Sequence, residues 1–177
     1  IKKNEFITVY QETEILTDSR DNKTYKTVKI GNQWWMAENL NYNIEGSYAY
    51  NINEDNAAIY GRLYDWPLAM DACPDGWHLP SKNEFQVLVN YSNTVHSYEL
   101  MSVSNLLYYS LCLGNPRANN KTGFSALPGG AYIWGFLGIN DEATFWTSSL
   151  YNNHPIHYYL VSAGNDDFVY YNDLDNN

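Results

Sequence analysis

Apolar and polar residues alternate along several short segments of this chain, which is typical of strands with one buried face. The segment 25–40 predicts two such strands joined at Gly31-Asn32. This dipeptide favours the positive φ values of a tight hairpin. Val28 and Ile30 flank a lysine, so we expect the first of the two strands to be half-buried.

Further strands are expected in the second half of the chain. The segment 144–149 alternates, and two aromatic, β-branched runs at 156–162 and 168–172 flank a turn-like "AGNDD". A β-branched run at 5–10 predicts a strand near the start. By contrast, we expect 41–58 to form a long Asn-rich loop.

Helix signals fall in the middle of the chain. Asp65 can cap a short helix that begins at Trp66, because a proline follows in the first turn. Ser81 and Glu84 form a capping box, which predicts a helix over 82–91 with Phe85, Leu88 and Val89 on its buried face. The apolar segment 99–113 fits a helix or a strand, and we favour a helix.

These elements predict an α+β fold with a mainly antiparallel sheet and about two short helices. We expect residues 1–17 to form a leader strand or linker and residues 18–177 to form one domain. The chain starts with Ile1 and not with methionine, so we interpret it as a mature or trimmed product.

Composition narrows the class of function. The formal net charge is -10, and the ten Lys and Arg residues form no run, which argues against nucleic-acid binding. No apolar stretch is long enough for a transmembrane segment. Aromatic residues reach 16%, with 17 tyrosines. Such an excess favours a recognition surface, although β-rich folds also use tyrosine.

The stretch "CPDGWHLPSKNEF" (73–85) holds residue types that can do chemistry. Cys73, Asp75 and His78 match no zinc spacing, and prolines fix the turn between them. We therefore interpret the stretch as a helix end, a Trp-Leu core plug and the start of the next helix. No nucleophile motif is present, but Cys73 beside a histidine stays open as a catalytic pair.

A second candidate site lies after residue 145. Alternate residues of a strand share a face, so one face of the C-terminal strands can present aromatic and amide groups to a glycan or a protein. The ligand-binding residues that we predict there are Trp146, Tyr151, Asn152, Asn153, His154, His157, Tyr159, Asp166, Asp167 and Tyr171. Asp166 and Asp167 could also supply oxygens to calcium, although no EF-hand loop is present; we expect no other cofactor.

Five long motifs share their order and spacing with one protein family: "TYKTVKIGNQWWMAENLNY", "YGRLYDW", "AMDACPDGWHLPSKNEF", "GFSALPGG" and "FWTSS". From about Asp18 onward the chain resembles the Fibrobacter succinogenes major paralogous domain. The resemblance implies a C-type-lectin-like fold, in the branch of formylglycine-generating enzymes and retroelement-diversified receptors. It also implies export to the bacterial surface, often on a lipoprotein of the outer membrane.

The chain departs from this family at its cysteines. Ala49 and Ala57 stand where many members have a cysteine pair. Members usually finish with a strand like G-F-S-V-R-C-V, whose cysteine would pair with Cys73, and this chain lacks it. The final strand is therefore expected to be missing, or supplied by a neighbouring subunit. A Cys73–Cys112 bond is the other option.

Three hypotheses about function follow. We favour an extracellular, lectin-like binding module of the adhesin type that recognises a glycan or a protein and is not an enzyme. The first alternative is a cell-surface enzyme on a formylglycine-generating-enzyme-like fold, but the reactive cysteine pair of those enzymes is not visible. The second is a structural subunit whose sheet is completed by a neighbour's strand.

Overall fold

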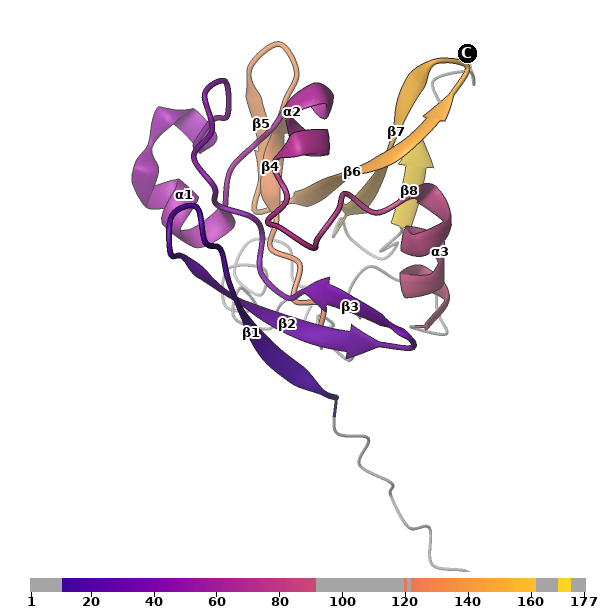
Figure 1. The fold of residues 1–177 in the computed structure, drawn as a ribbon. Helices are drawn as coiled ribbons and strands as arrows, with labels where there is room; N and C mark the ends of the chain where they lie inside the picture. The colour runs from indigo at the N-terminus through magenta and orange to yellow at the C-terminus, as the bar shows by residue number, and fades with distance from the viewer. Residues whose placement is uncertain (1–10, 92–119, 121, 162–168, 173–177) are drawn as a thin grey trace, which may run out of the picture.

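Two β-sheets and several short helices build the part of the chain that the structure describes (Figure 1). This computed structural model describes residues 11–91, 120, 122–161 and 169–172. The fold is α+β, as the sequence predicts. The strands expected at 5–10, the helix expected at 99–113 and the turn at 163–167 lie outside the described residues.

The first sheet has the strand order β1-β2-β3 and the second has the order β5-β4-β6-β7-β8. All neighbouring strands are antiparallel except β4 and β6, which pair in parallel through Gly130 and Ala143. The strands are β1 (Thr13–Thr17), β2 (Thr24–Ile30), β3 (Gln33–Met36), β4 (Gly129–Tyr132), β5 (Phe136–Ile139), β6 (Glu142–Tyr151), β7 (His154–Val161) and β8 (Val169–Asn172).

The helices are the 3-10 helix η1 (Tyr50–Ile52) and the α-helices α1 (Glu54–Tyr60), α2 (Trp66–Asp71) and α3 (Lys82–Tyr91). The last two begin where the sequence predicts. Asp65 accepts a hydrogen bond from the Leu68 amide, and the Ser81–Glu84 capping box closes in both directions. These start signals are local, and for that reason they can be recognised without knowledge of the fold.

The expected hairpin is confirmed. Ile30 pairs with Gln33 across the turn, and Gly31 takes the positive φ (61°) that the two-residue connection needs. Val28 and Ile30 are buried as the alternation predicts, but Tyr25 and Thr27 on the opposite face are buried too, so the strand is not half-buried as expected. Residues 13–17 add β1 to the other side of β2.

The loop prediction for 41–58 was wrong in part, because η1 and the start of α1 lie inside it. Asn53 caps α1 by accepting a hydrogen bond from the Asp55 amide, and two acidic residues follow in the first turn. Asparagine is common both in loops and at helix N-caps, so its density hid the start signal. Gly61 then ends the helix with a φ of 74°.

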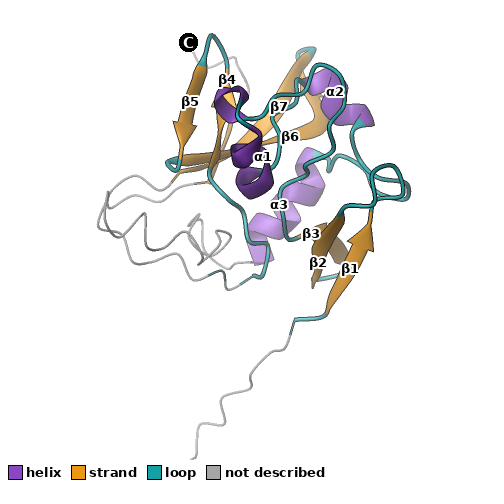
Figure 2. Ribbon diagram, turned by 90° about the vertical axis from the view of Figure 1, so that its left-hand side faces the viewer, coloured by secondary structure: helices purple, strands orange, loops and turns teal. Residues whose placement is uncertain are grey.

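The core is centred on Phe85 of α3, the helix that lies between the two sheets in Figure 2. Its ring stacks on Tyr158 of β7 at a centroid distance of 4.3 Å. It also meets Trp35 of β3 edge to face at 5.8 Å, and lies 6.1 Å from Phe124 and 5.9 Å from Phe145. One helix residue therefore joins the three-stranded sheet to the five-stranded sheet.

An ion pair with a buried carboxylate fixes the turn between β1 and β2. Asp18 is fully buried, and the Arg20 guanidinium donates to both of its oxygens at 2.8 and 2.7 Å. Arg20 also donates to the Ala72 carbonyl at 2.8 Å and lies over the Tyr42 ring. Its hydrogen bonds hold the pKa of Asp18 below its ordinary value.

Truncating the central ring tests the role of Phe85. Phe85 is 1% exposed, and Phe85→Ala should lower the free energy of unfolding by about 3–5 kcal/mol because it leaves a cavity. On the same helix Val87 is 48% exposed, so Val87→Ala should change it by no more than about 0.5 kcal/mol. Urea denaturation followed by tryptophan fluorescence measures both. Similar losses in the two variants would contradict the assignment.

Acidification should remove the stabilisation that the Asp18–Arg20 pair supplies. Since the pKa of Asp18 is lower in the folded than in the unfolded chain, this stabilisation is complete above the unfolded pKa of about 3.9. It is lost as the pH falls through the folded pKa. Denaturation curves at pH 7 and at lower pH should show a larger acid-induced loss for the wild type than for Asp18→Asn. An equal loss would show that the pair does not carry this part of the pH dependence.

Candidate functional site

A cleft of about 1030 Å³ is lined by residues of both sheets and of the segments that connect them. Its walls come from β3, the segment before α2, the segment between α2 and α3, β4, and the β6–β7 pair. Aromatic side chains dominate the lining, among them Trp34, Tyr48, Tyr64, Trp77, Trp146 and Tyr159. The cleft thus offers several large apolar faces, each with a polar group at its edge.

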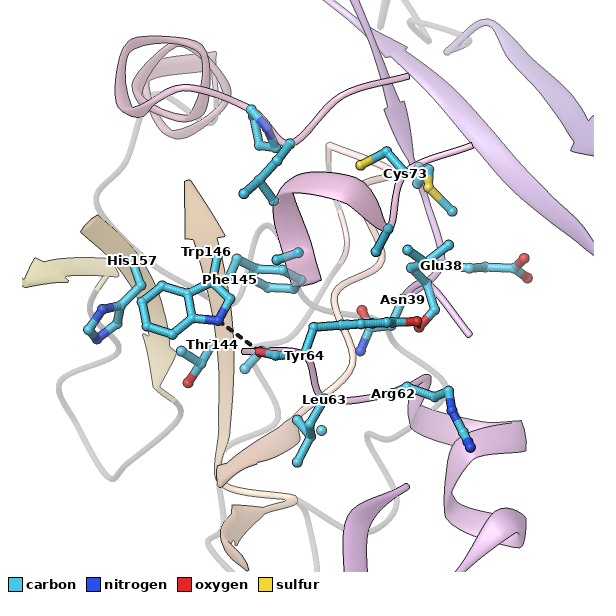
Figure 3. Close-up of a pocket in the computed structure, with 18 of the residues that line it drawn as sticks. Glu38, Asn39, Arg62, Leu63, Tyr64, Cys73, Thr144, Phe145, Trp146 and His157 are labelled. Carbon is cyan, nitrogen blue, oxygen red and sulfur yellow. Dashed lines mark hydrogen bonds between the residues drawn. The ribbon is translucent and has the colours of Figure 1, made fainter. Parts of the chain in front are cut away.

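Two tryptophans fix one wall of the cleft through main-chain acceptors. The indole N–H of Trp146 donates to the Tyr64 carbonyl at 2.9 Å, which Figure 3 shows as a dashed line. The indole N–H of Trp66 donates to the Thr147 carbonyl at 2.8 Å. The segment before α2 is therefore held against β6 by two hydrogen bonds that run in opposite directions.

The β6–β7 pair contributes a polar and aromatic face to the cleft. In the ladder Trp146 lies opposite His157, and Thr144 lies opposite Tyr159, so these four residues share a face. The His157 ring lies edge to face with Trp146 at 5.1 Å and with Tyr159 at 4.5 Å. In Figure 3 Thr144, Trp146 and His157 gather at one end of the residues drawn.

Burial changes the proton affinities on this face. His157 is 8% exposed, and the loss of solvation lowers the pKa of its imidazole. Burial also raises the pKa of the Tyr159 hydroxyl, with a smaller contribution from the charge of Glu142. Both groups are therefore neutral near pH 7, and each can donate or accept a hydrogen bond.

The stretch 73–85 contributes to the cleft in a way that the sequence did not suggest. Trp77 and Leu79, which we expected to plug a core, are half-buried and line the cleft. His78 Nε2 lies 3.2 Å from the Glu84 carboxylate. Among the described residues Cys73 has no disulfide partner, and burial raises the pKa of its thiol, which disfavours the reactive thiolate.

The predicted ligand-binding residues separate into groups. Trp146, His157 and Tyr159 come together in the cleft. A second group is exposed at the β6–β7 turn and does not line the cleft: Tyr151, Asn152, Asn153 and His154. Asp166 and Asp167 lie outside the described residues, and of Tyr171 only the backbone pairing with Tyr158 is described.

The two turn asparagines have a structural reason to be there. Asn152 and Asn153 take φ values of 47° and 66°, as a two-residue hairpin turn of type I′ requires. Asparagine tolerates this left-handed conformation better than most residues. Their presence in the sequence is thus accounted for by the turn.

Sequence reasoning missed Trp34, Tyr64 and Trp77 as parts of a site. The available signal was the density of aromatic residues before position 80, in "NQWWM", "GRLYDW" and "DGWHL". Nothing in these motifs shows that they meet β6 and β7, because the approach depends on contacts between distant segments.

Comparison with known proteins gives one result. A sequence model of the family described as Fibrobacter succinogenes major domain matches residues 28–171. No curated protein and no solved structure matches the chain. None of the described helices is long and apolar enough to cross a membrane. The described residues include no group of three or more His, Cys, Asp or Glu side chains that could hold a metal ion.

The low proton affinity of His157 can be measured directly. Because burial lowers its pKa, the imidazole should titrate below its ordinary value of about 6.5 in an NMR titration. As the pH falls, the His157 imidazole is therefore protonated in the unfolded chain before it is protonated in the folded chain. The free energy of unfolding should fall as the pH drops below about 6.5. The His157→Phe variant should lack this part of the pH dependence of stability. An imidazole that titrates at or above its ordinary value would contradict the burial argument.

Proposed function

The chain belongs to the Fibrobacter succinogenes major domain family, and we propose that it is a binding domain that holds a carbohydrate chain in the aromatic cleft. The C–H faces of sugar rings are apolar and pack on aromatic rings, while their hydroxyls need hydrogen-bonding partners at the edges. Tyr and Trp side chains meet both requirements at a low cost in conformational entropy.

The observation that carries the proposal is the shape of the aromatic surface. Small-molecule pockets usually measure about 300–1,000 Å³, and this cleft, at about 1030 Å³, lies at the upper end. It has room for more than one sugar ring. A concave surface of this kind favours a ligand that enters it over a partner with a flat surface.

The polar groups of the cleft support binding over nucleophilic catalysis. The Cys73 thiol has a raised pKa and so holds its proton more tightly than an ordinary cysteine. His78 is exposed and lies against Glu84, which itself belongs to the capping box of α3. These groups serve the fold, and they support a domain that recognises its ligand without transforming it.

The proposal extends to fold relationship and location. We take the fold to be C-type-lectin-like and the site of action to be the bacterial surface, because the family resemblance implies both. A binding domain of the adhesin type at that location would meet glycans of neighbouring cells or of the surrounding matrix.

A glycan array followed by calorimetry with the best-binding oligosaccharide tests the function. Trp77 and Trp146 line the cleft, and replacing either by alanine should weaken binding about tenfold or more, as for a central aromatic contact. Two variants are needed because Trp146 also holds the Tyr64 carbonyl. Loss in both therefore reports on the cleft and not on that hydrogen bond.

The matched controls are aromatic residues that do not line the cleft. Tyr151 is 43% exposed at the β6–β7 turn, and Trp134 is 99% exposed at the tip of the β4–β5 hairpin. Tyr151→Ala and Trp134→Ala should bind as the wild type does. If these two variants lose binding and the cleft variants keep it, the ligand sits on the outer surface and the proposed site is wrong.

A further inference from the structure

The acidic side chains in the cleft wall are already engaged by the protein. Glu84 accepts hydrogen bonds from the Ser81 amide and hydroxyl at 2.7 and 2.8 Å. Asp65 accepts from the Leu68 amide at 2.9 Å, and Glu38 accepts from a main-chain amide of β2 at 2.9 Å. The carboxylates of Glu84 and Asp65 each hold the start of a helix, and the carboxylate of Glu38 holds a strand. All three are therefore poorly placed to bind a cation.

The arginine of the cleft wall is engaged in the same way. Arg62 donates to both carboxylate oxygens of Glu54 at 3.0 to 3.1 Å. Its guanidinium is directed away from the Trp146 end of the cleft in Figure 3. The remaining charged residue of the lining, Glu14, is exposed on the edge strand β1. The described lining therefore leaves little charge available to a ligand.

Several neutral polar atoms of the lining, in contrast to the charged groups, are buried without a hydrogen-bond partner. They are Thr144 Oγ1, His157 Nδ1, Gln33 Oε1 and Trp35 Nε1. Buried polar groups in folded proteins are nearly always paired, because an unpaired one loses its hydration without compensation. Two of these exceptions, Thr144 Oγ1 and His157 Nδ1, share the β6–β7 face of the cleft, which points to a ligand that supplies the missing bonds there.

Thr144 and His157 lie next to each other on the β6–β7 face, diagonally across the ladder. No hydrogen bond holds the Thr144 hydroxyl in place, so rotation about χ1 can turn it toward the cleft without breaking a bond. A flip of the His157 ring also breaks no hydrogen bond at Nδ1. The neutral imidazole and the hydroxyl can each donate or accept, which suits a partner that does both.

We infer that the cleft selects uncharged sugars over acidic ones, and that Thr144 and His157 recognise their hydroxyl groups. This inference rests on the proposed function and adds the class of carbohydrate. An acidic sugar would lose hydration in the cleft and find no positive side chain near Thr144 and His157 in the described lining. The Glu142 carboxylate, two residues before Thr144 on the same face of β6, would repel it. A neutral sugar gives Thr144 Oγ1 and His157 Nδ1 the partners that they lack.

A pair of threonines on β6 offers a matched test. Thr144→Val removes an unpaired hydroxyl, so it should weaken binding about tenfold while leaving the melting temperature unchanged or raised. Thr147 is also buried, but its hydroxyl donates to the Ile156 carbonyl at 2.9 Å. Thr147→Val should therefore lower the melting temperature and leave the affinity unchanged. Thr144→Ser, which keeps the hydroxyl, should bind as the wild type does.

The charge preference is tested with oligosaccharides of equal length on the folded wild-type chain. Neutral hexasaccharides of glucose, xylose or N-acetylglucosamine are compared by calorimetry with hexagalacturonate. At least one neutral probe should bind with a dissociation constant tenfold or more below that of hexagalacturonate, and His157→Phe should weaken that binding.

The outcomes separate the inference from the function beneath it. If hexagalacturonate binds as well as every neutral probe, and Trp77→Ala still weakens that binding, the selectivity is wrong and the aromatic cleft stands. If Thr144→Val binds as the wild type does, the hydroxyl has no role in recognition. If no carbohydrate binds the wild type, the proposed function falls and the inference with it.

Discussion

The packing of one phenylalanine ring between two sheets is the constraint on which the rest of this structure depends. Phe85 reaches Trp35 on one side and Tyr158 on the other, so the sheets can separate only if α3 moves. The helix is itself held at its start by the capping box, and the Lys82 and Pro80 backbones bond to β6. The segment that begins α3 also reaches the cleft, because Pro80 and Glu84 are among the residues that line it.

The cleft owes its character to the way in which the fold uses its charges. This chain has few charged residues for its size, and those near the cleft cap helices, pair with one another or bind backbone groups. The aromatic rings and neutral polar atoms remain for other contacts. An acidic protein can thus present a cleft that is close to neutral, and that contrast separates the long-range field of the molecule from the chemistry of the cleft lining.

Local signals in the sequence were sufficient for part of the fold. The hairpin at Gly31 and the helix starts at Asp65 and Ser81 depend on residues within one turn, and they form as predicted. The start of α1 at Asn53 was missed because the same residue type serves loops and caps. Alternation along β7 correctly separates Tyr158 from Tyr159.

The site was only partly within reach of such reasoning. Trp146, His157 and Tyr159 could be named from strand alternation, whereas Trp34 and Trp77 reach the cleft through contacts between segments far apart in the chain. The indole N–H groups of Trp66 and Trp146 both donate to main-chain carbonyl oxygens, and every residue has such an oxygen. The backbone of this wall is thus anchored independently of the side chains at its acceptor positions. A change of side chain at an acceptor position leaves these two indole bonds in place, although at position 64 the Tyr64 hydroxyl also donates to the Tyr42 carbonyl at 2.8 Å and so anchors a further segment.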